Sequence, residues 1–380
     1  MDAQKLFPLG ITFDDVLLIP GYAGFSRSDI DLSTQLTKKI RLTAPFVSSP
    51  MDTVTESKLA ITLAEQGGIG IIHRNLTIED QADQVAEVAK KKLLVGAAIG
   101  ANTGFEDRAE ALVKAGVSVI LIDSAHGNAK TVIDAVKYIK KTFPTMEIIA
   151  GNIATKEGAE NLIEAGADGL RVGMGPGAIC TTRIISGMGV PQLTAIMDTV
   201  SVAKKTGVPV IADGGIKYSG DMVKAFAAGA ATVMMGSYFA GAMEAPGKLH
   251  ELTPAQVPSR FKSILSKKQA TYTFKEYRGM GSIAAMQEGA RIKSEDEFHG
   301  KSYKDRVLVA EGVESLTPVK GTLKDIVDQT IGGIRSGMYY VGVKTIQELH
   351  EKGRFMQITQ ASLSESHPHD ILITNPGENY

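Results

Sequence analysis

Eight short apolar runs recur between residues 44 and 237, and this repetition constrains the fold more than any other feature of the chain. The runs are rich in β-branched residues and pass into Gly, Asp, Ser or Asn, as is typical of strands buried in a parallel sheet. Each is therefore predicted to form one buried strand. The runs are Ala44–Pro50, Gly68–His73, Leu93–Gly100, Val117–Ala125, Glu147–Asn152, Gly169–Gly175, Pro209–Gly215 and Ala231–Ser237.

Segments with helical periodicity separate most of these runs. Examples are Glu106–Ala115, Ala129–Phe143, Thr155–Ala165 and Ser219–Ala228, and each gives way through Gly or Pro to the next run. The alternative to a barrel, a doubly wound open sheet, more often has about five to seven strands. Eight strand-then-helix units instead predict an α/β fold, a (β/α)8 TIM barrel, with residues 1–380 forming one catalytic domain.

Composition and charge exclude several classes of binding partner for this chain. The formal net charge is −1, and Lys and Arg are scattered, which argues against a general nucleic-acid binder. The single cysteine excludes an internal disulfide framework and zinc sites built on several thiolates. The N-terminus lacks the apolar core of a signal peptide, and no apolar run reaches the roughly 18 residues that span a bilayer. We therefore expect a cytoplasmic protein without a membrane or nucleic-acid partner.

The chemistry of such barrels sits at the carboxyl ends of the strands. In this chain those ends are rich in glycine and polar groups, so we expect the ligand there. They read Ser48-Ser-Pro-Met-Asp52, His73-Arg-Asn75, Asp123-Ser-Ala-His-Gly127, Gly151-Asn152, Gly173 to Cys180, Asp213-Gly-Gly215 and Gly236-Ser237.

Cys180 ends a glycine-rich loop that begins at Gly173. The glycines allow backbone amides to approach a ligand closely, and a thiolate is a strong nucleophile. The alternative is a buried, inert thiol, which is the common state of a free cysteine. The glycine-rich loop, the hydroxyls of Thr181 and Thr182, and the charge of Arg183 favour the nucleophile.

Two further strand ends suggest a phosphorylated ligand. Asp213-Gly-Gly215 and Gly236-Ser237 end the seventh and eighth runs, where barrels often bind phosphate through exposed backbone amides. Asp213 would accept hydrogen bonds from both hydroxyls of a ribose. The alternative is a simple Gly-Gly turn with Asp213 as a helix cap. The position of these residues in the barrel favours the phosphate site.

Asp123-Ser-Ala-His126, at the end of the fourth run, offers a carboxylate that would hold the ribose of a dinucleotide. His126 is a candidate acid or base, although a lone histidine is more often structural. His367-Pro-His369 is too isolated to indicate a zinc site.

Residues 250–320 follow the eighth run and are polar and irregular in pattern, with a charged stretch at Arg291–Arg306. We interpret them as a long functional loop, with an active-site flap at about 283–320. Tyr277-Arg-Gly-Met-Gly281 and Glu311-Gly312 would close over the pocket, and an ordinary surface loop is the alternative.

The tail at residues 360–380 lacks helix or strand periodicity from Leu363 onward. We expect it to extend from the barrel and to dock on a neighbouring molecule.

Taken together, these motifs resemble the IMP dehydrogenase and GMP reductase family. The variants at the fourth strand, the seventh strand and the flap are closer to the IMP dehydrogenases. The resemblance is carried by Thr12-Phe-Asp-Asp-Val-Leu-Leu18, Met51-Asp-Thr-Val-Thr-Glu56, Asp123-Ser-Ala-His-Gly127, Gly175-Pro-Gly-Ala-Ile-Cys-Thr-Thr-Arg183, Ala212-Asp-Gly-Gly-Ile-Lys-Tyr-Ser-Gly-Asp221, Tyr277-Arg-Gly-Met-Gly-Ser282 and Glu365-Ser-His-Pro-His-Asp370.

The resemblance implies that Cys180 adds to C2 of IMP, that hydride leaves to NAD⁺, and that water then releases XMP. It also implies a potassium ion and a homotetramer, because the ion is shared with a neighbouring subunit's tail. The implied substrate residues are Ser49, Met51, Ala178, Asp213, Gly214, Gly215, Gly236, Ser237, Tyr277, Arg278, Gly279, Met280, Gly281 and Glu311. The implied cofactor residues are Asp123, Gly173, Met174 and Gly175, and the implied potassium residues are Gly175, Gly177, Cys180, Glu365, Ser366 and His367.

The chain also departs from the family pattern. IMP dehydrogenases usually carry two regulatory CBS modules between the second and third strands, but Asn75–Lys92 leaves room for only one helix, so we expect no such module. The usual Ser of the cysteine loop is Ala178, which removes one hydroxyl from the implied phosphate site.

The flap lacks the Arg-Tyr pair that activates water in the family. The nearest match is Lys304-Asp-Arg-Val307, so Arg306 is the first candidate and Arg291 the second. If neither serves, Thr182 and Glu311 are the remaining proton carriers, which makes Cys180, Thr182, Arg306 and Glu311 the candidate catalytic residues.

Three functions therefore stay open. The first is NAD-dependent oxidation of IMP to XMP in guanine nucleotide synthesis. The second is reduction of GMP to IMP with NADPH, since GMP reductases also lack that pair. The third is a purine-nucleotide-binding paralogue without hydrolytic turnover.

Overall fold

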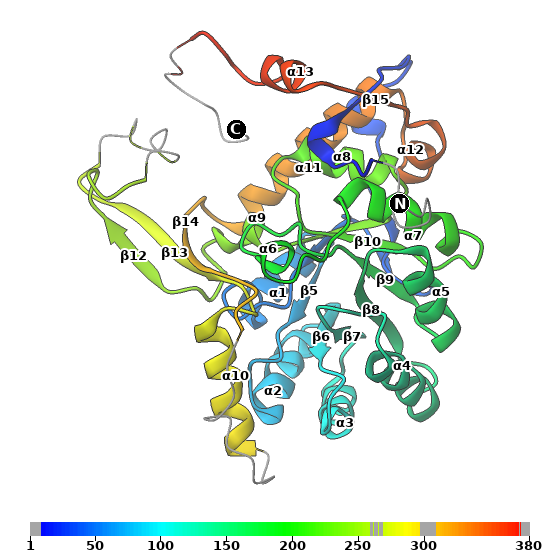
Figure 1. The fold of residues 1–380 in the computed structure, drawn as a ribbon, viewed down its shortest axis with the longest axis vertical. Coiled ribbons are helices and arrows are strands. Elements are labelled where there is room, and N and C mark those ends of the chain that lie inside the picture. The colour runs from blue at the N-terminus through cyan, green and yellow to red at the C-terminus, as the bar shows by residue number, and fades with distance from the viewer. Residues whose placement is uncertain are drawn as a thin grey trace, which may run out of the picture.

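Eight parallel strands close into a barrel at the centre of the molecule (Figure 1). The structure is a computed structural model that describes residues 9–258, 261, 265, 269–296, 309–371 and 373. The predicted (β/α)8 barrel is confirmed, and each of the eight predicted runs contains one barrel strand. The strands are β4 (Phe46–Ser48), β5 (Ile69–Ile72), β6 (Val95–Ile99), β7 (Val119–Asp123), β8 (Glu147–Ile153), β9 (Gly169–Val172), β10 (Val210–Asp213) and β11 (Thr232–Met235).

Helices surround the barrel, and local signals fix their ends. The Thr77 side chain caps α2 by accepting a hydrogen bond from the Asp80 N–H, and the Thr155 side chain caps α5 by accepting one from the Gly158 N–H. The four helical segments predicted from periodicity are confirmed as α3, α4, α5 and α8. The surrounding helices are α1 (Ser57–Glu65), α2 (Ile78–Lys90), α3 (Phe105–Ala115), α4 (Lys130–Thr142), α5 (Lys156–Ala165), α6 (Thr182–Ile185), α7 (Gln192–Ala203), α8 (Ser219–Ala227), α9 (Ser237–Ala240) and α11 (Leu323–Val341).

Two apolar layers hold the barrel together. Side chains two residues apart on one strand, such as Val119 and Leu121, point inward and fill its interior with those of neighbouring strands. Alternate residues such as Ile120 and Ile122 pack outward against the helices in a much larger cluster. The strand ends that carry the candidate site are therefore fixed on both faces.

The interpretation of residues 250–320 as irregular is wrong. This segment contains a three-stranded antiparallel sheet made of β12 (Leu249–Leu252), β13 (Tyr272–Arg278) and β14 (Glu314–Pro318), together with α10 (Ile283–Asp296). Its buried cluster is small, with Tyr272 and Phe274 of β13 and Val257, so the apolar pattern is sparse. We call the segment from Leu249 to Pro318 the inserted sheet.

The chain termini add small elements at one edge of the molecule (Figure 1). The tail is partly helical, because α13 (Gln360–Glu365) spans Leu363, where no periodicity was recognised. The helix contacts η1 (Phe13–Asp15), and Thr359 caps it by accepting the Ser362 N–H. The other elements are β1 (Val16–Leu18), η2 (Arg27–Asp29), β2 (Thr34–Gln35), β3 (Arg41–Leu42), α12 (Ile346–Lys352) and β15 (Phe355–Gln357).

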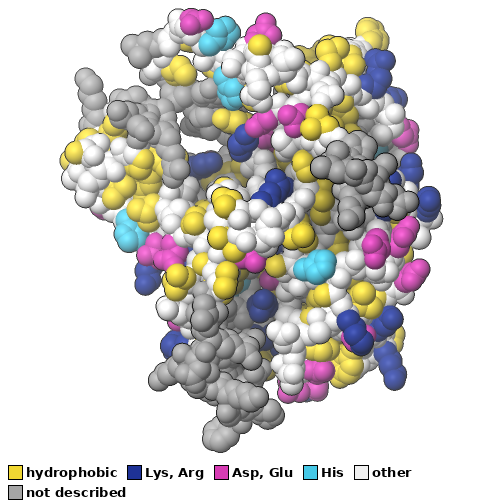
Figure 2. Space-filling view, in the orientation of Figure 1, with side chains coloured by type: hydrophobic (Ala, Val, Ile, Leu, Met, Phe, Trp, Pro, Cys, Tyr) yellow, Lys and Arg dark blue, Asp and Glu magenta, His cyan; other side chains and the backbone are white. Residues whose placement is uncertain are grey.

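The helices of the described residues are too short or too polar to cross a bilayer. Between β5 and β6 the chain forms α2 alone. On the face shown in Figure 2, lysine and arginine side chains are dispersed among acidic and hydrophobic ones rather than gathered in one patch.

Candidate active site

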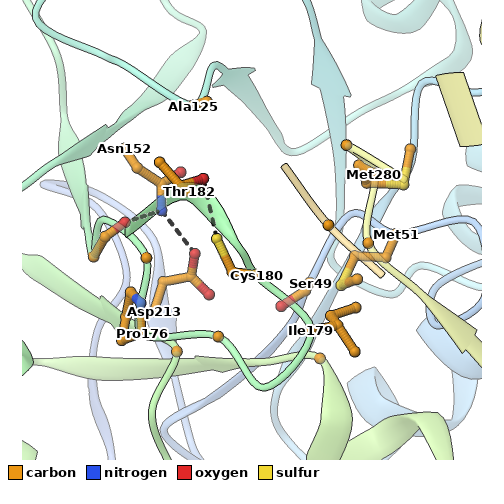
Figure 3. A pocket seen from close by; sticks show the side chains of 18 of the residues that line it. Ser49, Met51, Ala125, Asn152, Pro176, Ile179, Cys180, Thr182, Asp213 and Met280 are labelled. Atoms are coloured by element: carbon orange, nitrogen blue, oxygen red, sulfur yellow. Dashed lines mark hydrogen bonds between the residues drawn. The ribbon is translucent and has the colours of Figure 1, made fainter. Parts of the chain in front are cut away.

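A cavity of about 400 Å³ opens at the carboxyl end of the barrel (Figure 3). Residues at the ends of β4, β5, β7, β8, β9, β10 and β11 line it, and so do residues of the inserted sheet. Most of the predicted site residues line it, namely Ser49, Met51, Asp123, Gly173, Met174, Gly175, Gly177, Ala178, Cys180, Thr182, Asp213, Gly214, Gly215, Gly236, Ser237, Tyr277, Gly279, Met280, Gly281 and Glu311.

A chain of hydrogen bonds starts at the cysteine. The Cys180 thiol donates to Thr182 Oγ1 at 3.2 Å, and the Thr182 hydroxyl donates to Glu311 Oε2 at 2.8 Å. Thr182 and Glu311 are 129 residues apart in sequence. The chain gives the thiol proton a route through a hydroxyl to a carboxylate, which is the arrangement that activates a nucleophile.

Backbone pairing between two loops sets this geometry. Cys180 forms an isolated antiparallel bridge with Gly312, and Thr181 N donates to the Glu311 carbonyl at 3.0 Å. Val313 N donates to the Ile179 carbonyl at 3.0 Å and continues the pairing. The loop that carries the thiol and the segment that carries the carboxylate are therefore held in register.

A buried arginine joins two of the carboxylates that line the pocket, those of Asp123 and Asp213. Arg171 Nε donates to Asp213 Oδ2 at 2.9 Å, and its Nη1 donates to Asp123 Oδ1 at 2.5 Å. Burial is the largest single influence on the pKa of Arg171 and lowers it, but the two carboxylates outweigh burial and the pKa is raised. Arg171 thus stays charged and fixes the positions of both carboxylates.

Sequence reasoning missed the partners of these carboxylates. Arg171 lies inside the apolar run Gly169-Leu-Arg-Val172, and a charge in a buried strand was the signal available. Asn152 donates from Nδ2 to Asp213 Oδ2 and to the Gly173 carbonyl, both at 2.8 Å (Figure 3). Arg74 donates to Asp123 Oδ2 at 3.4 Å. Both residues belong to strand ends that the sequence had marked, Asn152 inside β8 and Arg74 just after β5.

The loop after β9 and the turn after β10 are closely packed. Gly173 has φ +151°, and a Cβ there would lie 2.1 Å from the Asp213 carbonyl oxygen. A Cβ on Gly214, which has φ +90°, would lie 3.0 Å from Pro176 Cγ. Glycine at these two positions lets the backbones meet at the pocket floor.

Tyr277 reaches the pocket from β13 and is 6% exposed. Its hydroxyl lies against Gly236, where a Cβ would come within 2.8 Å of the phenol oxygen. Burial is the main influence on the pKa of Tyr277 and raises it above its ordinary value, although hydrogen bonds with Ser237 act in the opposite direction. The phenol therefore stays protonated and offers a hydrogen-bond donor beside Gly236 and Ser237.

The cavity has a polar side and an apolar side. In Figure 3 Cys180 lies between the Asn152 and Asp213 side chains and a group formed by Ser49, Met51 and Met280. A flat apolar ring next to a hydroxyl-bearing sugar would suit such a division, because the thioethers supply adaptable contacts and the carboxylate accepts hydroxyl protons.

Some predicted residues lie elsewhere. Arg278 is absent from the cavity lining and binds Asp52 instead. His126 is exposed outside the lining. Arg291 forms an ion pair with Glu288 on the exposed side of α10.

Two further predictions concern the flap and the tail. Arg306 lies outside the described residues. Glu365, Ser366 and His367 are at the end of α13, where the His367 ring lies 6.3 Å from that of Tyr218. Any role of this triplet in a neighbouring subunit stays a prediction.

Comparison with known proteins gives matches over almost the whole chain. The family model described as the IMP dehydrogenase / GMP reductase domain matches residues 10–369. Inosine-5'-monophosphate dehydrogenase of Borreliella burgdorferi is 42% identical over an alignment 419 residues long, which covers 97% of this chain and 99% of that protein. The enzyme of the same name from Aquifex aeolicus is 38% identical over an alignment 508 residues long, which covers 100% of this chain and 99% of that protein. The enzyme of the same name from Haemophilus influenzae is 38% identical over an alignment 497 residues long, which covers 97% of this chain and 98% of that protein.

Proposed function

Because this chain belongs to the IMP dehydrogenase / GMP reductase family, we propose that it oxidises IMP to XMP with NAD⁺. The reaction serves guanine nucleotide synthesis and passes through a covalent adduct on Cys180. The observation that carries the proposal is the hydrogen-bonded chain from Cys180 through Thr182 to Glu311 inside the pocket. The names of the relatives described above support IMP as the substrate.

In the first half of the reaction Cys180 Sγ forms a bond to C2 of the hypoxanthine ring. The thiol proton passes to Thr182, whose own proton passes to Glu311 along the existing hydrogen bonds. NAD⁺ held by Asp123 and Gly173–Gly175 would supply the acceptor for the hydride that leaves C2. Glu311 then releases the thiol proton to solvent. In the second half water adds its oxygen to C2 and gives a proton to Glu311, the S–C2 bond breaks, XMP leaves, and the proton returns through Thr182 to the thiolate.

The substrate side of the pocket fits a nucleoside monophosphate. Asp213 Oδ2 is already occupied by Arg171 and Asn152, so Oδ1 is the oxygen that would accept the ribose hydroxyls. Gly214, Gly215, Gly236 and Ser237, with the Tyr277 phenol, would hold the phosphate. The backbone amides of that group replace the hydroxyl lost at Ala178. Met51, Met280 and Gly281 would contact the base, with Ser49 beside them.

The cofactor side is built around Asp123. Its carboxylate lines the pocket and is held by Arg171 and Arg74, which leaves lone pairs on both oxygens for ribose hydroxyls. Gly173, Met174 and Gly175 would contact the nicotinamide end. This donor set therefore fits a dinucleotide.

The water step needs a proton acceptor. Among the described residues of the pocket, Glu311 with Thr182 is the pair that we assign to this task. Arg306 stays a candidate for orienting the water, whereas Arg291 is engaged with Glu288.

The same proposal covers the potassium site, the assembly, the location and the domain content. The Gly175, Gly177 and Cys180 carbonyls would hold potassium with a neighbouring subunit's Glu365, Ser366 and His367, giving a homotetramer. Among the described residues, the Gly177 carbonyl accepts one hydrogen bond, from Cys180 N at 3.1 Å, so a lone pair would remain for the cation. Such an ion would stiffen the cysteine loop. We also propose a cytoplasmic enzyme with one catalytic domain and no CBS module.

The second candidate is reduction of GMP with NADPH. It is favoured by Lys304-Asp-Arg-Val307, which has Val where the water-activating Tyr would stand.

Purified protein with IMP, NAD⁺ and potassium, followed at the absorbance of reduced nicotinamide, tests the first candidate. Steady formation of NADH and XMP is expected. Consumption of NADPH with GMP, without turnover of IMP, would replace the first candidate with the second. One NADH per Cys180 without XMP release would indicate a paralogue that does not hydrolyse the adduct.

A further inference from the structure

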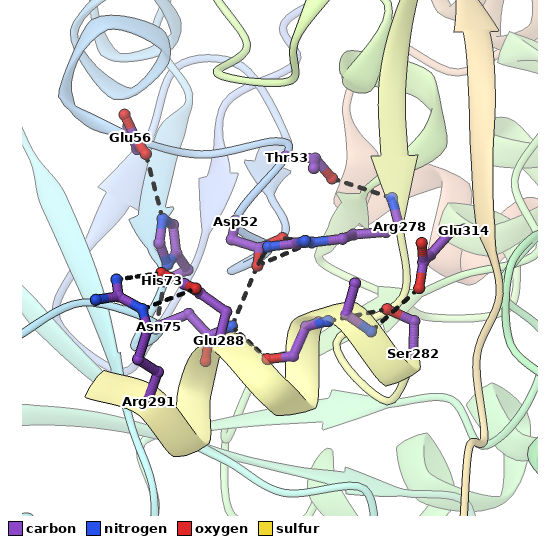
Figure 4. Close-up of polar contacts among 12 residues, drawn as sticks. Asp52, Thr53, Glu56, His73, Asn75, Arg278, Ser282, Glu288, Arg291 and Glu314 are labelled. Carbon is purple, nitrogen blue, oxygen red and sulfur yellow. Dashed lines mark hydrogen bonds and ion pairs between the residues drawn. The ribbon is translucent and has the colours of Figure 1, made fainter. Parts of the chain in front are cut away.

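Three polar side chains outside the cavity lining tie the inserted sheet to the barrel (Figure 4). Arg278 donates from Nε to both carboxylate oxygens of Asp52, at 3.1 and 3.2 Å, and from Nη2 to Oδ2 at 2.6 Å. Asn75 donates from Nδ2 to the same Oδ2 at 3.1 Å and to the Ala285 carbonyl of α10 at 3.0 Å. The Asp52 side chain is 7% exposed, so these bonds are largely shielded from water.

Close packing at Gly289 is a second, independent sign that α10 is docked at this place. A Cβ at position 289 would lie 2.7 Å from Asn75 Oδ1. Helix interiors disfavour glycine by about 1 kcal/mol relative to alanine, so the residue is not there for helix stability. It allows α10 to approach Asn75.

Each of the three tying residues is next in the chain to a residue that lines the cavity. Asp52 follows the β4 end, Asn75 follows the β5 end and Arg278 ends β13, so three separate segments meet in one cluster. A shift in the cluster would therefore shift both sides of the pocket at once. The adjoining lining residues are Met51, Arg74, Tyr277 and Gly279.

We propose that Asp52, Asn75 and Arg278 form a latch that positions α10 and the Met280–Gly281 turn over the pocket. The latch residues touch neither the nucleotide nor the cofactor and act through the lining residues beside them. The effect on catalysis rests on the proposed oxidation of IMP, whereas the effect on α10 does not.

The first test is Asp52→Asn, which keeps the shape of the side chain and removes its charge. A displacement of about 1 Å in a positioned site lowers rates by up to about a hundredfold, so we expect kcat/KM for IMP to fall between tenfold and a hundredfold. The KM should rise more than kcat falls, because Met280 and Gly281 are expected to contact the base. Arg278→Lys keeps the charge but loses the paired contact and should be milder than Arg278→Gln.

The second test uses hydrogen exchange and does not depend on activity. Asp52→Asn should speed exchange of the amides of residues 283–291 and leave the barrel strands unchanged. Gly289→Ala should do the same, despite the better helix propensity of alanine, because its Cβ displaces Asn75. In an Asn75→Ala background the Gly289→Ala change should no longer speed exchange, because the contact with Asn75 is gone and the helix propensity of alanine remains. Gln287→Ala, on the exposed side of the same helix, is the matched control and should leave exchange no faster.

The third measurement is protection of Cys180 from iodoacetamide by IMP, which reports nucleotide binding without turnover. Wild-type protection that weakens in Asp52→Asn would support the latch. Unchanged exchange at 283–291 in both Asp52→Asn and Gly289→Ala would overturn it. Absence of protection in the wild type would count against the proposed function, while the exchange data would still decide on the latch.

Discussion

On the barrel side of the pocket, the lining residues come from strand ends that lie between two apolar layers. On the other side, they come from the inserted sheet, whose buried cluster consists of Val257, Tyr272 and Phe274. The barrel side carries Cys180 and the bridged carboxylates. The inserted sheet carries Tyr277, and Glu311 lies just before β14. Both sides are needed for the same chemistry, yet the large core holds the barrel side, and among the described residues of the inserted sheet only Tyr277 packs into that core.

Polar ties take the place of a core in the inserted sheet. Lys275 is buried, and its ammonium donates to the carbonyls of Ala242, Met243 and Ala245 beyond the barrel strands. Arg278 binds Asp52, and Glu311 binds Thr182. Such bonds are directional, so they fix position more sharply than apolar contact but are lost one at a time. We therefore expect the barrel to stay rigid while the inserted sheet opens by local unfolding on its own.

The largest expected effect is on the barrel side, at the nucleophile. Cys180→Ala should lower turnover of IMP by at least about 10⁴-fold, because no other thiol exists in the chain. Steady-state NADH formation checks this, with circular dichroism as the control for folding. Turnover that survives the change would contradict covalent catalysis.

A pair of core substitutions compares the two halves directly. Phe226 belongs to the barrel cluster and Phe274 to the inserted sheet, and both are fully buried. Each change to alanine should cost about 3–5 kcal/mol. Phe226→Ala should lower the free energy of unfolding of the whole chain, whereas Phe274→Ala should speed hydrogen exchange in β12–β14 alone. Equal acceleration in both halves by both variants would show one cooperative unit instead.

The next effect concerns the carboxylate that the inserted half contributes to the thiol. Glu311→Gln keeps a hydrogen-bond acceptor for Thr182 but no longer takes a proton, so kcat should fall about a hundredfold. Rapid-quench measurement of adduct formation and XMP release would locate the slowed step. Glu276→Gln, which alters a partly exposed pair with His250, is the matched control. A kcat within twofold of wild type would assign the proton to another group.

The smallest expected effect is a pH dependence on the barrel side. His350 of α12 contacts the Ala230 carbonyl at 3.0 Å, and burial lowers its pKa below the ordinary value, although that hydrogen bond raises it. Its contribution to stability is therefore present above the ordinary histidine pKa and is lost as pH falls below it, because the unfolded chain binds the proton first. His350→Gln should reduce the drop in Tm between pH 7.5 and pH 5.5 by on the order of 1 °C. Thermal scans at the two pH values check this, and an unchanged drop would remove His350 as a cause.

Local sequence patterns determined the barrel. Its strands are buried on both faces, so their apolar runs are continuous, and their ends mark the pocket loops by chain position alone. Cys180 stood out because glycines surround it. The inserted sheet was not predicted because its strands do not alternate cleanly between buried and exposed residues. In β13 the buried Lys275 directly follows the buried Phe274, and β14 has no buried residue, which weakens the period of two.

The tertiary structure alone decided which polar groups meet. Thr182 and Glu311 are 129 residues apart, and Arg278 and Asp52 are 226 apart, so no local pattern links either pair. Arg171 was readable as a charge in an apolar strand, but only the closed barrel places Asp123 and Asp213 on either side of it. Periodicity reports which face of an element is buried, whereas the partner of a buried charge is set by the packing of distant elements.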